Sequence, residues 1–180
     1  MRRTFPAFVF VMAASVILIQ LDARAAAEPG QPAPALVVQE LSGQTFDLAA
    51  MRGKVVIINF WATWCPPCRD EMPALDRFYR RYHGQGLEMI GLAANRTHEQ
   101  SDVAKVMESY SYPAAMLRDC KRNGFNDPTE LPVTYIVDTQ GILRAKLTPE
   151  ETPITDQSLT EVVLPLLSNQ TKRNGAGPGS

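Results

Sequence analysis

The stretch that decides the fold runs from residue 53 to residue 73 and reads GKVVIINFWATWCPPCRDEMP. Residues 55–60 form an apolar run, as expected of a strand that is covered on both faces. Apolar side chains then recur at three-to-four-residue spacing over residues 66–83, which predicts an amphipathic helix. Two cysteines, separated by two prolines, therefore lie where a buried strand passes into a helix.

This position of the cysteine pair favours redox chemistry. Unpaired backbone N–H groups and the helix dipole stabilise negative charge at a helix start. We therefore expect Cys65 to have a depressed pKa and to be the exposed, attacking thiolate. We expect Cys68, one turn further along, to be more buried and to resolve the mixed disulfide, so that Cys65–Cys68 is the redox disulfide. Pro66 suits the first helical turn, where its missing N–H group costs nothing, and together with Pro67 it stiffens the loop.

A lone Cys-x-x-Cys motif is also compatible with half of a zinc site or with a structural disulfide. The chain has three cysteines and two histidines, with no second Cys-x-x-Cys. Cys120, His83 and His98 show no ligand spacing, so no metal and no cofactor is expected. We expect the third cysteine to be a buried free thiol, the commoner state of an unpaired cysteine.

Length and charge predict how the rest of the chain is organised. The chain has 180 residues and a formal net charge of −1, which indicates one domain without the basic patch of a nucleic-acid binder. Two arginines, an apolar run and small residues indicate a signal peptide or membrane anchor over residues 1–27. Residues 28–34 read as a linker, 35–167 as the folded domain and 168–180 as a flexible polar tail.

Strand and helix patterns alternate within this domain. Turn residues between two short apolar segments at 35–48 predict a hairpin, and Ser158 with Glu161 forms the pattern of a capping box. Together the patterns indicate an α/β fold with a mixed sheet. Further strands are predicted at 87–93, 113–117, 133–137 and 142–147, and further helices at 103–110 and 159–167.

The 53–73 stretch resembles the active-site region of the TlpA/ResA/CcmG-like thioredoxin family, whose members are exported or membrane-anchored disulfide reductases. The resemblance extends more loosely to residues 35–48 and to residues 131–138, which read LPVTYIVD. It implies a thioredoxin-like fold, with a mixed central sheet flanked by helices and an added N-terminal β-hairpin. It also implies an enzyme, a thiol–disulfide oxidoreductase.

The resemblance assigns two further parts of the site. Pro132 matches the family's cis-proline, which faces the cysteine pair, and the backbone of Leu131 pairs with a bound substrate strand. Glu71 matches a family glutamate and lies three residues after Cys68, on the same helix face. A partly buried carboxylate there would have a raised pKa and could exchange protons with the thiols, whereas a solvated surface acid would not.

Neighbouring positions support this assignment. Asn59 stands where similar cytoplasmic thioredoxins carry a buried aspartate, and an asparagine side chain cannot accept the proton. This departure strengthens Glu71 as the catalytic proton relay. Trp64 is expected at the rim of the docking surface, where Pro66 and Pro67 also contact the substrate.

The implied function is a periplasmic reductase of disulfides or cysteine pairs in client proteins. Clients of this family include apocytochromes c, which must be reduced during cytochrome c maturation. Electrons would come from a membrane thiol donor of the CcdA/DsbD type, at the outer face of the bacterial inner membrane, with membrane anchoring as one arrangement. The residues themselves support only exchange. A disulfide oxidase or isomerase and a non-catalytic metallochaperone accessory protein therefore remain open, whereas the close cysteine pair argues against a peroxiredoxin-like peroxidase, which would need one peroxidatic cysteine in its own pocket.

Overall fold

The structure is a computed structural model that describes residues 27–175. The predicted signal peptide or membrane anchor lies outside this range apart from its last residue. Within residues 27–175, no helix is long and apolar enough to cross a bilayer.

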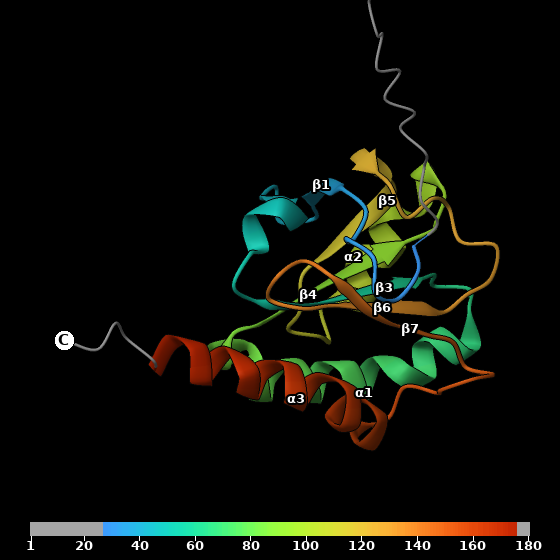
Figure 1. Cartoon of the computed structure of the whole chain (residues 1–180). Helices are drawn as coiled ribbons and strands as arrows, with labels where there is room; N and C mark the ends of the chain where they lie inside the picture. Colours follow the sequence, from blue (N-terminus) through green and yellow to red (C-terminus); the bar gives the residue numbers. More distant parts are fainter. Residues whose placement is uncertain (1–26, 176–180) are drawn as a thin grey trace, which may run out of the picture.

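One mixed sheet forms the centre of the described chain (Figure 1). Its strand order is β2-β1-β5-β4-β3-β6-β7. The three inner strands β5, β4 and β3 are parallel, and the remaining pairs are antiparallel. This confirms the predicted mixed sheet with an added hairpin. The strands are β1 (Leu36–Glu40), β2 (Thr45–Asp47), β3 (Val55–Trp61), β4 (Leu87–Ala93), β5 (Ala114–Asn123), β6 (Val133–Val137) and β7 (Leu143–Leu147).

Strand β3 owes its central place to its apolar composition. It pairs with β4 on one side and β6 on the other, and all of its residues are buried. Such a strand has no edge exposed to water, which is why it lacks the polar alternation of a half-exposed strand. Its carboxyl end leads directly into the cysteine motif.

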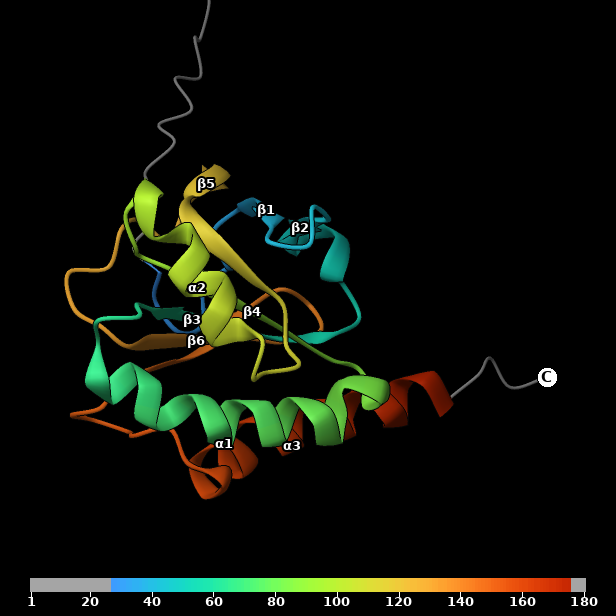
Figure 2. The same ribbon diagram turned by 180° about the vertical axis from the view of Figure 1, so that it is seen from behind.

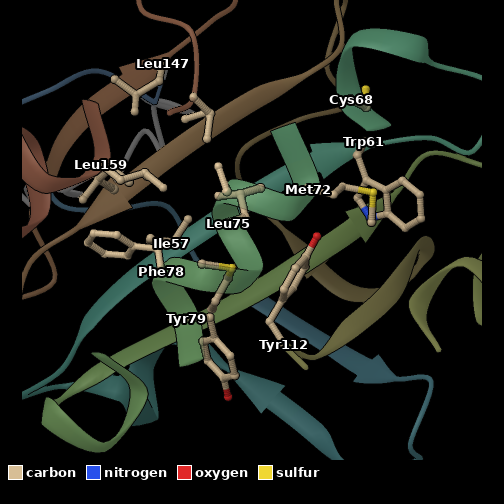
Figure 3. Packing of buried hydrophobic residues seen from close by; sticks show 14 of the residues in the cluster. Ile57, Trp61, Cys68, Met72, Leu75, Phe78, Tyr79, Tyr112, Leu147 and Leu159 are labelled. Atoms are coloured by element: carbon tan, nitrogen blue, oxygen red, sulfur yellow. The ribbon is translucent and has the colours of Figure 1, made fainter. Parts of the chain in front are cut away.

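The helices α1 (Pro66–Tyr82) and α3 (Asp156–Gly175) lie side by side on one face of the sheet (Figures 1 and 2). Apolar residues of α1 point between helix and sheet, as Figure 3 shows for Leu75 and Phe78. Val103 of α2 (Gln100–Met107) joins the same cluster. A second cluster on the other face joins the hairpin to β3, β4 and β6. Short 3-10 helices occupy Leu48–Met51, His83–Gln85 and Thr97–Glu99.

Helix α2 lies three residues earlier than the predicted range 103–110, and two other elements extend well beyond their predicted bounds. Strand β5 continues to Asn123 because it pairs antiparallel with β1, through an irregular register. Helix α3 begins at Asp156 and continues to Gly175 into the predicted tail. Its start uses Thr155 and Ser158, whose side chains each accept a hydrogen bond from the other's backbone N–H group, at 3.0 and 2.9 Å. The predicted capping box that begins at Ser158 is therefore wrong, since Ser158 already lies inside the helix.

Candidate active site

The cysteine pair lies at the start of α1, where the sequence placed it. Cys65 is the N-cap residue and Pro66 is the first residue of the helix. The Sγ atom of Cys65 accepts a hydrogen bond from the backbone N–H of Cys68 at 3.3 Å, and the two sulfurs form a disulfide. The same N–H group and the helix dipole would stabilise a thiolate on Cys65 after reduction.

The two cysteines differ in burial, but less than expected. Cys68 is fully buried, whereas Cys65 is 5% exposed. The prediction that Cys65 is an exposed residue is therefore wrong, although it remains the more accessible of the two. Its side chain turns back over the first turn of α1 because it caps that turn. Figure 3 shows Cys68 next to Trp61 and Met72, in the apolar cluster that these three residues share.

A groove opens at Cys65. The predicted substrate-binding residues Trp64, Pro66, Pro67 and Leu131 all contribute to it, and Cys65 supplies the sulfur. Trp64 is 60% exposed, which is unusual for so large an apolar side chain. The other lining residues are Ala94, Pro128, Thr129 and Glu130.

The loop opposite the cysteines contains the expected cis bond. The Leu131–Pro132 peptide is cis. Leu131 lines the groove, whereas Pro132 is buried and is not among the lining residues. Of the two, the structure therefore places Leu131 where a docked chain would touch it and Pro132 behind it.

Glu71 is buried beneath the first turns of α1 and is not a surface acid. Its side chain is 8% exposed, and its Oε1 atom accepts a hydrogen bond from Nδ2 of Asn59 at 2.7 Å. Burial raises the pKa of Glu71 to about 7, because desolvation disfavours the carboxylate, and the hydrogen bond from Asn59 opposes this rise. Glu71 can therefore both take and release a proton near neutral pH.

Two residues near the site were not identified from the sequence. Thr134, fully buried on β6, accepts a second hydrogen bond from Nδ2 of Asn59 at 2.9 Å. Asn95, just after β4, holds the loop before Cys65: it accepts from the backbone N–H of Thr63 at 3.0 Å and donates to the Thr63 hydroxyl at 2.7 Å. Polar residues at strand ends are common, so neither position carried a distinguishing signal.

Cys120 lies apart from these residues, on β5. It is free, and burial raises the pKa of its thiol to about 11. The expectation of a free third thiol is confirmed, although its side chain is only partly buried. A thiol with this pKa is almost fully protonated at neutral pH and is a poor nucleophile.

Taken together, a dithiol at a helix start, a groove open to one of its sulfurs and a carboxyl that titrates near neutrality can carry out thiol–disulfide exchange. The fold and the site define a thiol–disulfide oxidoreductase of the thioredoxin-like fold.

Comparison with known proteins gives the family. The chain belongs to the AhpC/TSA family, whose model matches residues 29–146. It is similar to the thiol-disulfide oxidoreductase ResA of Bacillus cereus, with 34% identity over 125 residues, 68% of this chain and 71% of that protein. ResA of Bacillus subtilis (strain 168) is 32% identical over 114 residues, 62% of this chain and 63% of that protein.

Solved structures agree with the thioredoxin-like fold. A thiol:disulfide interchange protein of the thioredoxin family from Chlorobium tepidum TLS is 29% identical, with a TM-score of 0.63, over 79% of this chain and 99% of that one. A thio-disulfide isomerase from Thermus thermophilus has a TM-score of 0.62 over 77% of this chain and 96% of that one, at 23% identity, and supports the fold alone. The resemblance to ResA-like proteins, the thioredoxin-like fold and the oxidoreductase class are confirmed.

Proposed function

We propose that this protein is an exported reductase that transfers two electrons from its Cys65–Cys68 dithiol to disulfides of client proteins. The observation that carries the proposal is the arrangement of three groups. Cys65 opens on the groove, Cys68 is fully buried behind it, and Glu71 is a buried carboxyl on the same helix. Each group has the access that one step of the reaction requires.

In the first step, the Cys65 thiolate attacks a client disulfide that is bound in the groove. One client sulfur becomes bonded to Cys65, and the other leaves as a thiolate and takes up a proton. Trp64 and the backbone of Leu131 flank the attacking sulfur, so they would hold the client chain during this step. The apolar face of Trp64 is suited to cover a docked peptide because the ring is 60% exposed beside the groove.

In the second step, the buried Cys68 thiol becomes the nucleophile. Glu71, three residues further along α1, takes its proton, and the Cys68 sulfur attacks Cys65. The client sulfur leaves as a thiolate, which is then protonated, and the Cys65–Cys68 disulfide remains. A carboxyl with an ordinary pKa would be a weak base for a thiol, whereas one with a pKa of about 7 is better matched to it.

The cellular setting is part of the same proposal. The family resemblance and the pattern of residues 1–27 support a place in the bacterial periplasm or on the outer face of the inner membrane. There, a membrane thiol donor of the CcdA/DsbD type would reduce the Cys65–Cys68 disulfide again. Apocytochromes c are suitable clients because their Cys-x-x-Cys-His segment must be reduced before haem is attached.

Trapping of mixed disulfides tests the roles of the two cysteines. Cys68→Ser should accumulate mixed disulfides with clients, because the resolving thiol is missing. Dithiothreitol should reduce these covalent complexes and release the clients. Cys65→Ser should neither turn over insulin nor accumulate complexes. Non-reducing electrophoresis after alkylation would show both results, and trapping by Cys65→Ser alone would reverse the assigned roles.

The direction of electron flow needs a separate measurement. Equilibration of the purified protein with glutathione buffers gives the reduction potential of the pair. A value near that of thioredoxin, about −270 mV, would support a reductase, whereas one near that of the strong oxidant DsbA, about −120 mV, would favour an oxidase. Tight Cu(I) binding by the reduced protein without disulfide exchange would favour a metallochaperone accessory protein.

A further inference from the structure

We propose that Asn59 and Thr134 are positioning residues for the proton transfer: they hold the Glu71 carboxyl by its Oε1 atom and leave Oε2 as the oxygen that exchanges the proton. Thr134 acts through Asn59 and not on Glu71 directly. This proposal rests on the proton-relay role of Glu71 in the proposed function.

The three residues come from three different elements that meet beneath the cysteine motif. Asn59 on β3 and Thr134 on β6 are directly opposite each other in the antiparallel pairing of these strands. Glu71 reaches them from α1. Cross-strand partners on one face have Cβ atoms about 5 Å apart, so the register alone keeps the threonine hydroxyl within reach of the amide. Thr134 follows the cis Leu131–Pro132 bond by two residues, so the strand that leads from the client-facing loop also anchors the amide.

The hydrogen bonds determine how the amide is oriented. The Nδ2 atom of Asn59 has two hydrogens, and it donates one to Glu71 Oε1 and one to Thr134 Oγ1, at 2.7 and 2.9 Å. The Oδ1 atom of Asn59 is buried without a hydrogen-bond partner among the described residues. The reversed amide would place Oδ1 against a carboxylate oxygen, which is repulsive. The carboxylate therefore favours the nitrogen on its side, and the Thr134 hydroxyl, which can accept as well as donate, accommodates this orientation.

This orientation gives the two oxygens of Glu71 different roles. Oε1 is occupied by the amide hydrogen, whereas no hydrogen bond from a described residue reaches Oε2. A proton that binds Oε2 leaves Oε1 as a carbonyl-type oxygen, which still accepts from Asn59. The amide therefore stays in place in both protonation states, and the transfer needs no rearrangement of the buried network.

The other groups around Glu71 leave the amide as its main polar contact. The cysteine pair on the same helix is a disulfide and does not titrate, whereas the pKa of the buried Tyr112 hydroxyl is raised by its burial and, to a lesser degree, by charges that include Glu71. Strands β3 and β6 contribute the uncharged pair Asn59 and Thr134. Helix α3 packs on α1 through apolar residues such as Leu159, and its ion pair between Asp156 and Arg77 is exposed.

The experiment compares Thr134→Val with Thr134→Ser in the oxidised protein. Valine has the shape of threonine without the hydroxyl, whereas serine keeps the hydroxyl. The carboxyl carbon of Glu71 is titrated by ¹³C NMR. Without its anchor, the amide of Asn59 can leave Oε1, and the carboxylate loses its donor. The Glu71 midpoint should rise by about one pH unit in the valine variant, the shift expected when about 1.4 kcal/mol of preference for the charged form is lost. The serine variant should titrate like the parent protein.

A second comparison tests whether Thr134 acts through the amide. In an Asn59→Ala background the Glu71 midpoint should already be raised, and adding Thr134→Val should move it no further. An unchanged midpoint in Thr134→Val would overturn the proposal, and so would additive shifts in the double variant. Thr139→Val, beyond the other end of β6, is the matched control and should leave the midpoint unchanged.

The titration also separates this inference from the proposed function, since it needs no client and no turnover. If Cys68→Ser traps no clients while the Glu71 midpoint responds to Thr134→Val, the client-reductase role fails and the positioning role stands. If Cys68→Ser traps clients while the Glu71 midpoint does not respond to Thr134→Val, the reductase role stands and the positioning role fails.

Discussion

Replacing Glu71 with glutamine should stabilise the oxidised protein, and the gain should depend on pH. The pKa of Glu71 is about 7 in the folded protein, against an ordinary value of 4.5. The proton is therefore bound more tightly in the folded than in the unfolded chain. The stability that this adds is fully present below pH 4.5 and is lost as the pH rises through 7. At 1.36 kcal/mol for each unit of pKa, the difference between 4.5 and about 7 corresponds to roughly 3 kcal/mol of folding stability, and all of it is lost once the pH is well above 7.

Glutamine resembles the protonated acid at every pH and can still accept the hydrogen bond from Asn59. The variant should therefore match the parent protein at pH 4 and exceed its free energy of unfolding by about 3 kcal/mol at pH 8.5. Urea unfolding curves of both oxidised proteins at the two pH values measure this difference. Asp70→Asn removes the same charge from the adjacent, exposed position, and it should change stability by less than about 0.5 kcal/mol at either pH. A Glu71→Gln gain that is equal at both pH values would refute the reasoning, because it would not come from titration.

Three further outcomes are expected. Trp64→Ala should lower kcat/KM for protein disulfides more than for a small aromatic disulfide, because the exposed ring contacts a docked chain; equal losses in the two assays would place Trp64 outside the docking surface. Asn95→Ala removes both hydrogen bonds to Thr63 and should reduce the free energy of unfolding by about 1–3 kcal/mol. Amide exchange in the loop before Cys65 should also become faster. Exchange as slow as in the parent protein would show that Asn95 does not hold this loop in place. Cys120 should react with iodoacetamide at pH 8 at least about tenfold more slowly than an unhindered thiol, as followed by intact mass, because its pKa is about 11; rapid labelling would show that the thiol is more exposed than the structure indicates.

The central part of the fold could be predicted because its signals are local. The apolar run of β3 and the spacing of α1 specify their elements without reference to other segments. Strand β4 and strand β6 match their predicted ranges for the same reason. The extension of β5 to Asn123 could not be predicted, since residues 118–123 are largely polar and become a strand only through pairing with β1. Non-local pairing of this kind leaves little trace in the sequence of either partner.

The candidate site divides in the same way. The helix-start position of Cys65 follows from its local sequence, and so does the greater burial of Cys68. The depth of Cys65 does not, because it depends on how the motif packs against Trp61 and Met72. The hydrogen bonds that converge on Asn59 also depend on tertiary structure, since they join residues that are 12 and 75 positions away in the chain.

The membership of Cys68 in the apolar cluster under α1 links two measurable properties of the protein. Reduction breaks the bond between two sulfurs that are packed among core side chains. The oxidised and reduced forms therefore differ in their free energy of folding. This difference sets the reduction potential of the folded pair relative to that of the same pair in the unfolded chain. For a two-electron couple, about 1.4 kcal/mol corresponds to about 30 mV. A substitution at Met72 or Trp61 that favours one redox form by this amount would therefore change the potential without touching either sulfur. In this molecule, core packing around the disulfide therefore helps to set the reduction potential of the enzyme.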